Sequence, residues 1–302
     1  MGLYVDECDF VLDKCIKRDP EGHCSVYRGR MRNKDVGIKV MRIFDKRDMV
    51  EFLLSAWSYG LDATLRDTAV MTRNLAFNEM YFLYKFSKNP FFGTLKGYYI
   101  NYTLAELYLF TEWVENETLA NLIIKSASLS LIEFMSVYFQ ILFLVEMLNA
   151  MGITHCDLHA ENILVTTYTI ETSFERYITQ DGREFFLPNC GKRVIIWDMT
   201  FARAETAPCL AAVELVDRHR QKFGLKFKAP LFEDLHFVMA PLYAAVNPTY
   251  RVAADHILQS YEYQICKNRG RMCDLINAIF YLMTVTKILL DDSPKFDFRV
   301  AS

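Results

Sequence analysis

The chain has 302 residues, of which 52% are hydrophobic and 24% charged, and its formal net charge is −3 at pH 7. This composition excludes an intrinsically disordered protein, because it supplies enough apolar surface for a sizeable core. The nearly balanced charge also argues against a protein that holds nucleic acid by bulk charge. We therefore expect one large domain or two close lobes, without direct nucleic-acid binding.

The eight cysteines form no CxxC pair, and no secretory signal sequence opens the chain. This pattern predicts reduced thiols in an intracellular protein without a zinc site, and it does not separate nucleus from cytoplasm. The two longest apolar stretches, residues 134–153 and 275–290, are both interrupted by polar residues. We expect them to be buried helices rather than membrane spans.

Short runs rich in β-branched and aromatic residues dominate the first third of the chain. The runs predicted to be strands are 11–17, 24–31, 35–43, 98–102 and 106–114. Polar turns separate the first three, which predicts a three-strand meander. Segment 45–88 should contain at least one helix, because its apolar residues recur at helical spacing.

After residue 115 the pattern becomes helical, at 118–125 and 131–151. In the strand-rich patch that follows, Gln180-Asp181-Gly182 separates the alternating segments 173–179 and 183–187. Asp-Gly in such a position is a strong hairpin signal. The remainder, from residue 232 on, is mostly helical in pattern. This order of elements predicts an α+β chain with a β-rich first lobe and a mostly helical second lobe.

The sharpest chemical signal is the polar loop His155-Cys156-Asp157-Leu158-His159-Ala160-Glu161-Asn162. An Asp followed five positions later by an Asn suits phosphoryl transfer. The carboxylate can orient a substrate hydroxyl and accept its proton, while the amide oxygen can bind magnesium. Taken alone, the loop is also compatible with an ordinary polar turn.

Two further signals are charged residues in apolar segments of the chain. An apolar strand ends at Asp198, where a carboxylate can bind a cation that bridges phosphates. Lys39 lies in the middle of another apolar strand, where burial is costly unless the lysine has a partner. Glu79, in a helical segment, is the candidate partner. Taken singly, each of these residues also fits a solvated position or a turn.

Five of these residues occur in the order found in eukaryotic protein kinases: Lys39, Glu79, Asp157, Asn162 and Asp198. The resemblance implies that Lys39, paired with Glu79, holds the phosphates of ATP. It implies that Asp157 is the catalytic base and that Asn162 and Asp198 bind Mg²⁺.

The same resemblance implies a bilobal kinase-like fold, with an N-lobe at 1–113 and a C-lobe at 114–302. Segment 107–114 resembles the strand and hinge that join the lobes, with Thr111 at the gatekeeper position. Further residues that the resemblance places around the nucleotide are Gly22, Val26, Glu112, Trp113 and Val114.

Within the kinases, the chain is most similar to the haspin-like group. Asp157-Leu158-His159 carries His where most Ser/Thr kinases carry Lys, so His159, when protonated, would be an auxiliary donor to the transferred phosphoryl group. Asp198-Met199-Thr200 resembles Asp-Tyr-Thr, and Pro188-Asn189-Cys190-Gly191 resembles Pro-Ser-Cys-Gly. Asp234 resembles the helix F Asp that braces the catalytic loop.

The chain also departs from the kinase pattern. Asp19, Glu21 and Cys24 occupy the three slots of the glycine-rich loop, where side chains hinder approach to phosphates. Cys156 replaces the Arg that commonly contacts a phosphorylated activation loop. An Ala-Pro-Glu motif is missing, because Ala229-Pro230 continues with Leu231.

We expect a monomeric Ser/Thr protein kinase that uses ATP and Mg²⁺ and acts on a protein hydroxyl. Haspin itself acts on a basic histone tail. The basic run 218–228 equally fits an ordinary solvated face; if it contacts the substrate, it favours acidic, phosphorylated or nucleic-acid-bound substrates. Two alternatives remain open at this stage. One is a pseudokinase that serves as a regulatory or scaffolding module, and the other is a small-molecule kinase with the same core residues.

Overall fold

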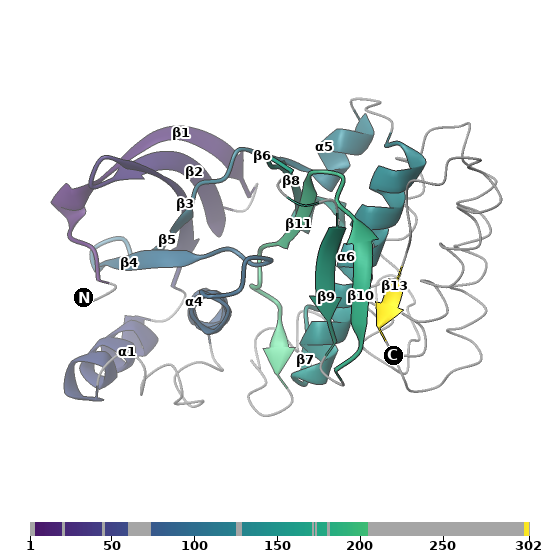
Figure 1. The fold of residues 1–302 in the computed structure, drawn as a ribbon. Helices are drawn as coiled ribbons and strands as arrows, with labels where there is room; N and C mark the ends of the chain where they lie inside the picture. Colours follow the sequence, from purple (N-terminus) through teal and green to yellow (C-terminus); the bar gives the residue numbers. More distant parts are fainter. Residues whose placement is uncertain are drawn as a thin grey trace, which may run out of the picture. The chain divides into compact units, whose positions relative to one another are not determined.

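The computed structural model of this chain describes residues 4–19, 22–43, 46–59, 74–124, 129–170, 172, 174–179, 182–204 and 299–301. The predictions for Glu21, the basic run 218–228, Asp234, the stretch 275–290 and the rest of the helical region after residue 232 lie outside these residues. Within them the fold is mixed α+β with a β-rich N-terminal region (Figure 1). Contacts divide the described chain into two compact units, which we describe separately. The first holds the chain up to Glu115 together with residues 197–204, and the second holds Asn116–Ile196 and residues 299–301.

The first unit is built on a five-stranded antiparallel sheet with the order β1-β2-β3-β5-β4. Its strands are β1 (Phe10–Arg18), β2 (Cys24–Met31), β3 (Lys34–Arg42), β4 (Leu95–Asn101) and β5 (Glu106–Glu112). The 3₁₀ helix η1 (Glu7–Asp9) precedes β1, and the short strand β12 (Arg203–Ala204) also belongs to this unit. The predicted three-strand meander is confirmed, because β1, β2 and β3 pair in sequence order.

Two helices lie in the segment predicted to hold at least one: α1 (Lys46–Tyr59) and α4 (Leu75–Lys85). Asn74 caps the start of helix α4, and its side chain accepts a hydrogen bond from the Ala76 backbone N–H at 3.0 Å. Phe52 and Phe77 stack with their ring centroids 4.4 Å apart and join the two helices. Together the helices bury an apolar cluster against one face of the sheet.

Strand β3 separates two apolar clusters, because successive side chains point to opposite faces of a sheet. Met41 belongs to the cluster that includes residues of α1 and α4, whereas Ile38 belongs to a second cluster that includes Tyr108 and Phe110. By this alternation Lys39 lies on the same face as Met41. The sheet therefore presents Lys39 to the helix-covered side, and Val40 to the other side.

The second unit contains two three-stranded sheets, with the orders β11-β8-β6 and β13-β10-β9. Its elements are β6 (Asn116–Thr118), α5 (Leu119–Ile124), α6 (Leu131–Ala150), β7 (Ile153–Thr154), η2 (Ala160–Asn162), β8 (Ile163–Thr167), β9 (Phe174–Ile178), β10 (Glu184–Pro188), β11 (Lys192–Ile196) and β13 (Arg299–Ala301). The predicted Asp-Gly hairpin is confirmed, since β9 and β10 pair antiparallel. Gly182 has a φ of +85° in its turn, a conformation that glycine adopts without strain.

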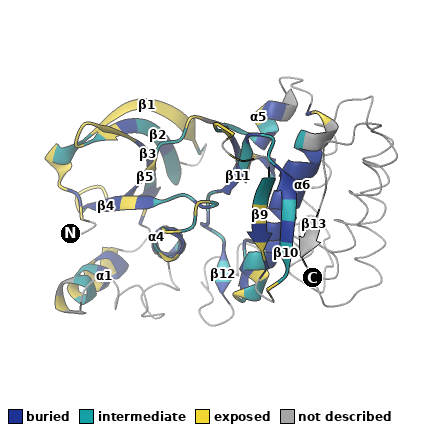
Figure 2. Cartoon of the chain, in the orientation of Figure 1, coloured by how far each residue is buried: buried dark blue, intermediate teal, exposed yellow. Residues whose placement is uncertain are grey.

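Helix α6 is the core element of the second unit, and Figure 2 shows most of its length as buried. It begins with a capping box, in which Ser130 and Glu133 exchange hydrogen bonds. The stretch Glu133–Ala150 is long and apolar enough to cross a membrane, but 78% of it is buried within the protein, as in a core helix. The buried Gln140, which interrupts this stretch, accepts from Val194 N–H at 2.9 Å and donates to Lys192 C=O at 2.9 Å. This polar residue therefore ties α6 to β11.

Candidate functional site

A buried lysine in the first unit lies between two carboxylates and a hydroxyl. Lys39 Nζ is 2.7 Å from Asp198 Oδ1, 3.3 Å from Glu79 Oε1 and 2.9 Å from Thr200 Oγ1. The Lys39 side chain is only 5% exposed and that of Glu79 only 1%, whereas the Asp198 side chain is 22% exposed. Three of the five residues chosen from the kinase-like motif order are therefore in contact, although Lys39 and Asp198 are 159 positions apart.

The electrostatics of this cluster are dominated by burial and by its excess of negative groups. Burial alone would lower the pKa of Lys39, but the nearby charges of Asp198 and Glu79 outweigh it and raise the pKa above its ordinary value. Burial raises the pKa of Glu79 to about 7, even though Lys39 acts in the opposite direction. Lys39 is thus firmly cationic, and Glu79 gains a proton more easily than an ordinary carboxylate does.

Thr200 makes this proton assignment more specific. Its hydroxyl oxygen lies 2.6 Å from Asp198 Oδ1 and 2.9 Å from Glu79 Oε2, and it accepts from Lys39 Nζ. A hydroxyl carries one hydrogen, so it can donate to only one of the two carboxylates. The other contact requires a proton on the carboxylate, and the raised pKa of Glu79 makes Glu79 the suitable holder.

Helix α4 also fixes the segment that carries Asp198. The buried Asn78 side chain donates to the carbonyl oxygens of Thr200 and Ala202, each at 2.8 Å. Asp198 itself has a φ of +62°, in the left-handed region that few residues other than glycine adopt. Two adjacent residues of α4 therefore act on one segment, since Glu79 contacts the Thr200 side chain and Asn78 binds its backbone.

Residues on the Lys39 face of the sheet form its immediate surroundings. Val26 lies directly opposite Lys39 on β2, and Gly37, two positions before Lys39, lies opposite Thr111 on β5. A Cβ atom at Gly37 would lie 3.0 Å from Thr111 Oγ1, so glycine allows this close approach. Burial raises the pKa of the nearby Cys24 thiol to about 11, although Lys39 lowers it. Cys24 is therefore a neutral thiol at physiological pH.

Two of the altered glycine slots are described: Asp19 follows β1 in the β1–β2 turn, and Cys24 is the first residue of β2. The Asp19 carboxylate accepts from the His23 backbone N–H at 3.1 Å, and the Gly22 N–H donates to Asp19 C=O at 2.9 Å. Gly22 has a φ of +74°, and a Cβ atom there would meet nothing within 4 Å. The carboxylate of Asp19 thus stabilises its own turn.

The predicted hinge residues begin with Glu112, the last residue of β5, and continue with Trp113 and Val114. Glu112 uses its backbone N–H to bond Thr94 C=O at 3.0 Å, and its exposed side chain pairs with Lys96 at 3.2 Å. The Trp113 indole N–H donates to Glu115 at 3.1 Å, and the Arg28 guanidinium lies 5.2 Å from the centre of its ring. Trp113 and Val114 are half-buried. The Glu112 N–H is therefore already occupied by the protein itself.

The second unit carries the other candidate group, in the loop between β7 and β8. The Asn162 side-chain amide donates to Asp157 C=O at 2.9 Å and to Asp157 Oδ2 at 3.2 Å. His159 Nε2 lies 3.6 Å from Asp157 Oδ2, and His159 Nδ1 accepts from Glu161 N–H at 3.3 Å. Nε2 of the same ring also lies 3.2 Å from the Asn162 amide nitrogen. Asp157, His159 and Asn162 thus form one connected loop.

These hydrogen bonds determine how Asn162 is oriented. The Asn162 amide nitrogen faces two Asp157 oxygens and His159 Nε2, so the Asn162 carbonyl oxygen Oδ1 is directed elsewhere. That atom is buried, with Asn162 only 1% exposed, and it has no hydrogen-bond partner among the described residues. A buried oxygen acceptor without a partner is costly unless a ligand satisfies it. Its chemistry fits Mg²⁺, which prefers oxygen ligands, as does the carboxylate of Asp198 in the first unit.

Two residues of the first cluster were not assigned a role from the sequence. Thr200 appears only as the third residue of the motif Asp198-Met199-Thr200, and no motif assigns a role to Asn78. A polar residue next to Glu79 inside an apolar helix was the available signal for Asn78, because buried amides need partners. The chain matches no protein-family model and no curated protein.

Proposed function

We propose that this chain is an ATP- and Mg²⁺-dependent serine/threonine protein kinase with a bilobal, haspin-like core. The observation that carries the proposal is the contact of Lys39 with Glu79 and Asp198 inside the first unit. Burying a cation with two carboxylates removes much of the water that hydrates them. Well-packed apolar residues usually stabilise a fold at least as well as such a buried cluster of charges. Phosphoryl transfer gives these three residues a purpose, because Lys and Asp are the groups that handle phosphates and their metal.

The loop of the second unit supports the same chemistry. Asp157 is half-exposed, and Asn162 and His159 lie beside its carboxylate. Such a carboxylate can orient a substrate hydroxyl and accept its proton. His159 Nε2, on the same side as the carboxylate, can donate to a phosphoryl oxygen.

In this proposal Asn162 and Asp198 hold Mg²⁺, and Lys39 holds phosphate oxygens of ATP. Bound magnesium neutralises charge that develops on the phosphates. Val26, on the Lys39 face of the sheet, provides apolar surface for the adenine. The backbone at Glu112, whose N–H is already bonded to Thr94 C=O, and at Trp113 and Val114 faces its polar edge in this proposal. Gly22, in the β1–β2 turn, allows the turn to approach the phosphates.

One observation favours a second candidate, a pseudokinase that binds partners without transferring phosphate. Asp19, in the β1–β2 turn, and Cys24, at the start of β2, stand where kinases have glycines, and the Asp19 carboxylate accepts from the His23 backbone N–H. A turn of this kind offers fewer backbone N–H groups to phosphates. A small-molecule kinase is the third candidate, because it would use the same core residues.

The deciding experiment measures phosphate transfer from Mg·ATP to a panel of Ser/Thr peptides that includes acidic, phosphorylated and histone-tail sequences. The full chain is compared with Asp157→Ala and with Glu161→Gln, a control that changes an exposed carboxylate in the same loop. Transfer that is lost in Asp157→Ala and kept in Glu161→Gln supports the kinase. The melting temperature is measured in parallel with ATP, with and without Mg²⁺.

The other outcomes separate the candidates. A Tm raised by Mg·ATP without transfer to any hydroxyl favours the pseudokinase. Transfer to small-molecule alcohols alone favours the third candidate. Neither transfer nor a change in Tm would overturn the proposal.

A further inference from the structure

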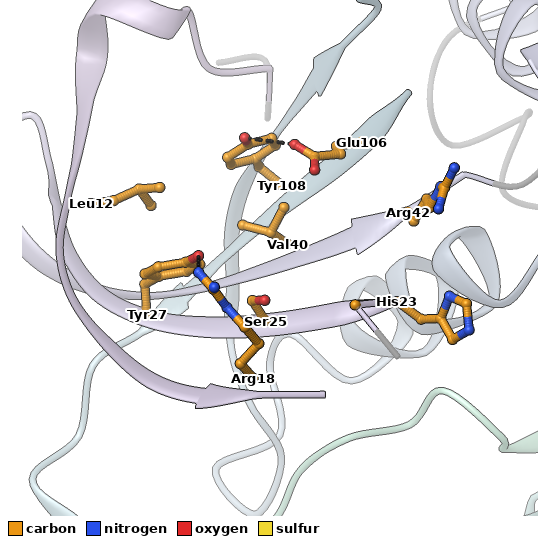
Figure 3. A pocket seen from close by; sticks show the side chains of 10 residues that line it. Leu12, Arg18, His23, Ser25, Tyr27, Val40, Arg42, Glu106 and Tyr108 are labelled. Carbon is orange, nitrogen blue, oxygen red and sulfur yellow. Dashed lines mark hydrogen bonds between the residues drawn. The ribbon is translucent and has the colours of Figure 1, made fainter. Parts of the chain in front are cut away.

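A pocket lies on the first unit, on the face of the sheet opposite to Lys39. Its volume is about 300 Å³, and its lining side chains come from strands β1, β2, β3 and β5 and from the β1–β2 turn (Figure 3). Arg18 pairs with Ser25, Ser25 with Val40 and Val40 with Tyr108, so one row of directly opposed residues crosses four strands. Val40 follows Lys39 in the chain and therefore points to the other face. Most of the pocket therefore faces away from the site proposed for ATP, and of the residues proposed there only Gly22, in the β1–β2 turn, also lines the pocket.

Among the described residues, the positive charges around the pocket are not all balanced by carboxylates. Arg28, Arg30 and Arg32 of the same meander each form an ion pair with an aspartate. Arg18 and Arg42, which line the pocket, have no carboxylate partner among the described residues. Arg18 is 3.3 Å from the Tyr27 hydroxyl, a neutral partner.

One carboxylate lines the pocket together with these two arginines. Glu106 lies directly opposite Arg42 on β5 and accepts a hydrogen bond from the Tyr108 hydroxyl at 2.9 Å. Two guanidinium groups and one carboxylate leave a positive excess, before any charge on the neighbouring imidazole of His23. Guanidinium groups bind phosphate and carboxylate oxygens in pairs, which makes an anion the matching ligand.

The other residues that line the pocket determine which kind of anion fits it. The Ser25 and Tyr27 hydroxyls add neutral hydrogen-bonding groups beside Arg18, so the pocket offers more donors than the two oxygens of a carboxylate need. Leu12, Val40 and the tyrosine rings add apolar surface, and the volume is at the small end of ligand sites. We propose that this pocket binds a phosphate monoester with a small apolar body, whose phosphoryl group is held by Arg18 and Arg42.

Isothermal titration of the full chain with phenyl phosphate tests this assignment. Inorganic phosphate and benzoate are the comparison ligands, because one lacks the apolar body and the other lacks the phosphoryl group. A short peptide that contains phosphotyrosine distinguishes a phosphorylated protein from a free phosphate ester as the source of the group. We expect phenyl phosphate to bind more tightly than either comparison ligand.

Substitutions of pocket residues test whether phenyl phosphate binds in this pocket. Arg18→Gln and Arg42→Gln should each weaken phenyl phosphate binding about tenfold, the effect of losing one charged hydrogen bond. Glu106→Gln should strengthen it, because the substitution removes a negative charge next to the phosphoryl group. Arg30→Gln removes a charge from the same sheet outside the pocket and should leave binding unchanged. Both pocket arginines are exposed, so their variants should fold, which circular dichroism and the Tm verify.

The assignment is overturned if phenyl phosphate does not bind at millimolar concentration. It is also overturned if benzoate or inorganic phosphate binds as tightly, or if Arg18→Gln and Arg42→Gln bind like the parent chain. Because all these readouts are binding constants, the result is independent of whether the protein transfers phosphate.

Discussion

A single amide group of Asn162 binds Asp157 twice, at the backbone oxygen and at the carboxylate. This arrangement leaves Oδ1 of Asn162 as a buried acceptor without a partner among the described residues. One residue can therefore both orient the proposed base and bind the proposed metal. The two roles predict a particular pattern of kinetics.

Asn162→Ala should lower kcat for peptide phosphorylation about 10- to 100-fold, the usual effect of losing a group that orients or binds at a metal site. Because a magnesium ligand is lost, the variant should also need more Mg²⁺ for half-maximal rate. Rates measured over a range of Mg²⁺ concentrations test both effects. Asn121→Ala, on the exposed part of α5, is the control. An unchanged magnesium requirement would contradict the metal role of Asn162.

Lys39→Met should destabilise the first unit, because it leaves Glu79 and Asp198 without their cation. Breaking a buried ion pair in this way costs about 3–5 kcal/mol. In the double variant with Glu79→Gln, one of the two uncompensated charges is gone, so part of the loss should be recovered. Urea unfolding at pH 8 measures both variants against Lys34→Met, which removes an exposed lysine from the same strand. Additive effects of the two substitutions would show that Lys39 and Glu79 do not interact.

Glu79 should give the stability a pH dependence of known sign. Burial raises its pKa to about 7 in the folded protein, from an ordinary value of 4.5. Between these two values the folded chain holds a proton that the unfolded chain has lost, so the free energy of unfolding should fall as the pH rises from about 4.5 to 7. Urea unfolding at several pH values, compared between the parent chain and Glu79→Gln, isolates this contribution. An equal slope in both proteins would rule out Glu79 as its source.

Cys24 should resist alkylation in the folded protein. Burial raises the pKa of its thiol to about 11, and the thiolate is the reactive form. Cys8 and Cys15 are exposed and should react first with iodoacetamide at pH 8. Peptide mass spectrometry after timed labelling gives the order, and labelling in urea provides the unprotected rate. Rapid labelling of Cys24 in the folded chain would show that its surroundings are not as buried as described.

The sequence predicted the local elements of the described region well, because their signals are local. Alternating apolar residues identified the β1–β2–β3 meander, and Asp181-Gly182 identified the hairpin between β9 and β10. It predicted at least one helix between residues 45 and 88, where the structure has α1 and α4. The division into two helices has no equally clear signal in the apolar spacing.

The candidate site shows a different limit. The sequence suggested Lys39, Glu79 and Asp198 through their order, and the structure brings these three into contact. It did not suggest how they share protons, because the role of Thr200 follows from three distances around one oxygen atom. No sequence pattern predicted the arginine pocket either, since Arg18, Arg42 and Glu106 become neighbours only through strand register. Contacts between distant residues depend on pairing that no local pattern encodes.

Asn78 should be essential for holding the Asp198 segment. Its amide donates to the carbonyl oxygens of Thr200 and Ala202, and Asn78 is only 3% exposed. In Asn78→Leu, a change of similar size, both carbonyl groups lose their donor, at a cost of about 1–3 kcal/mol for each group left unsatisfied. Urea unfolding measures the loss, and the Mg·ATP-induced change in Tm reports whether Asp198 keeps its position. Asn121→Leu, at an exposed position of α5, is the comparison. If Asn78→Leu were as stable as the parent chain and responded equally to Mg·ATP, α4 would not be what positions Asp198.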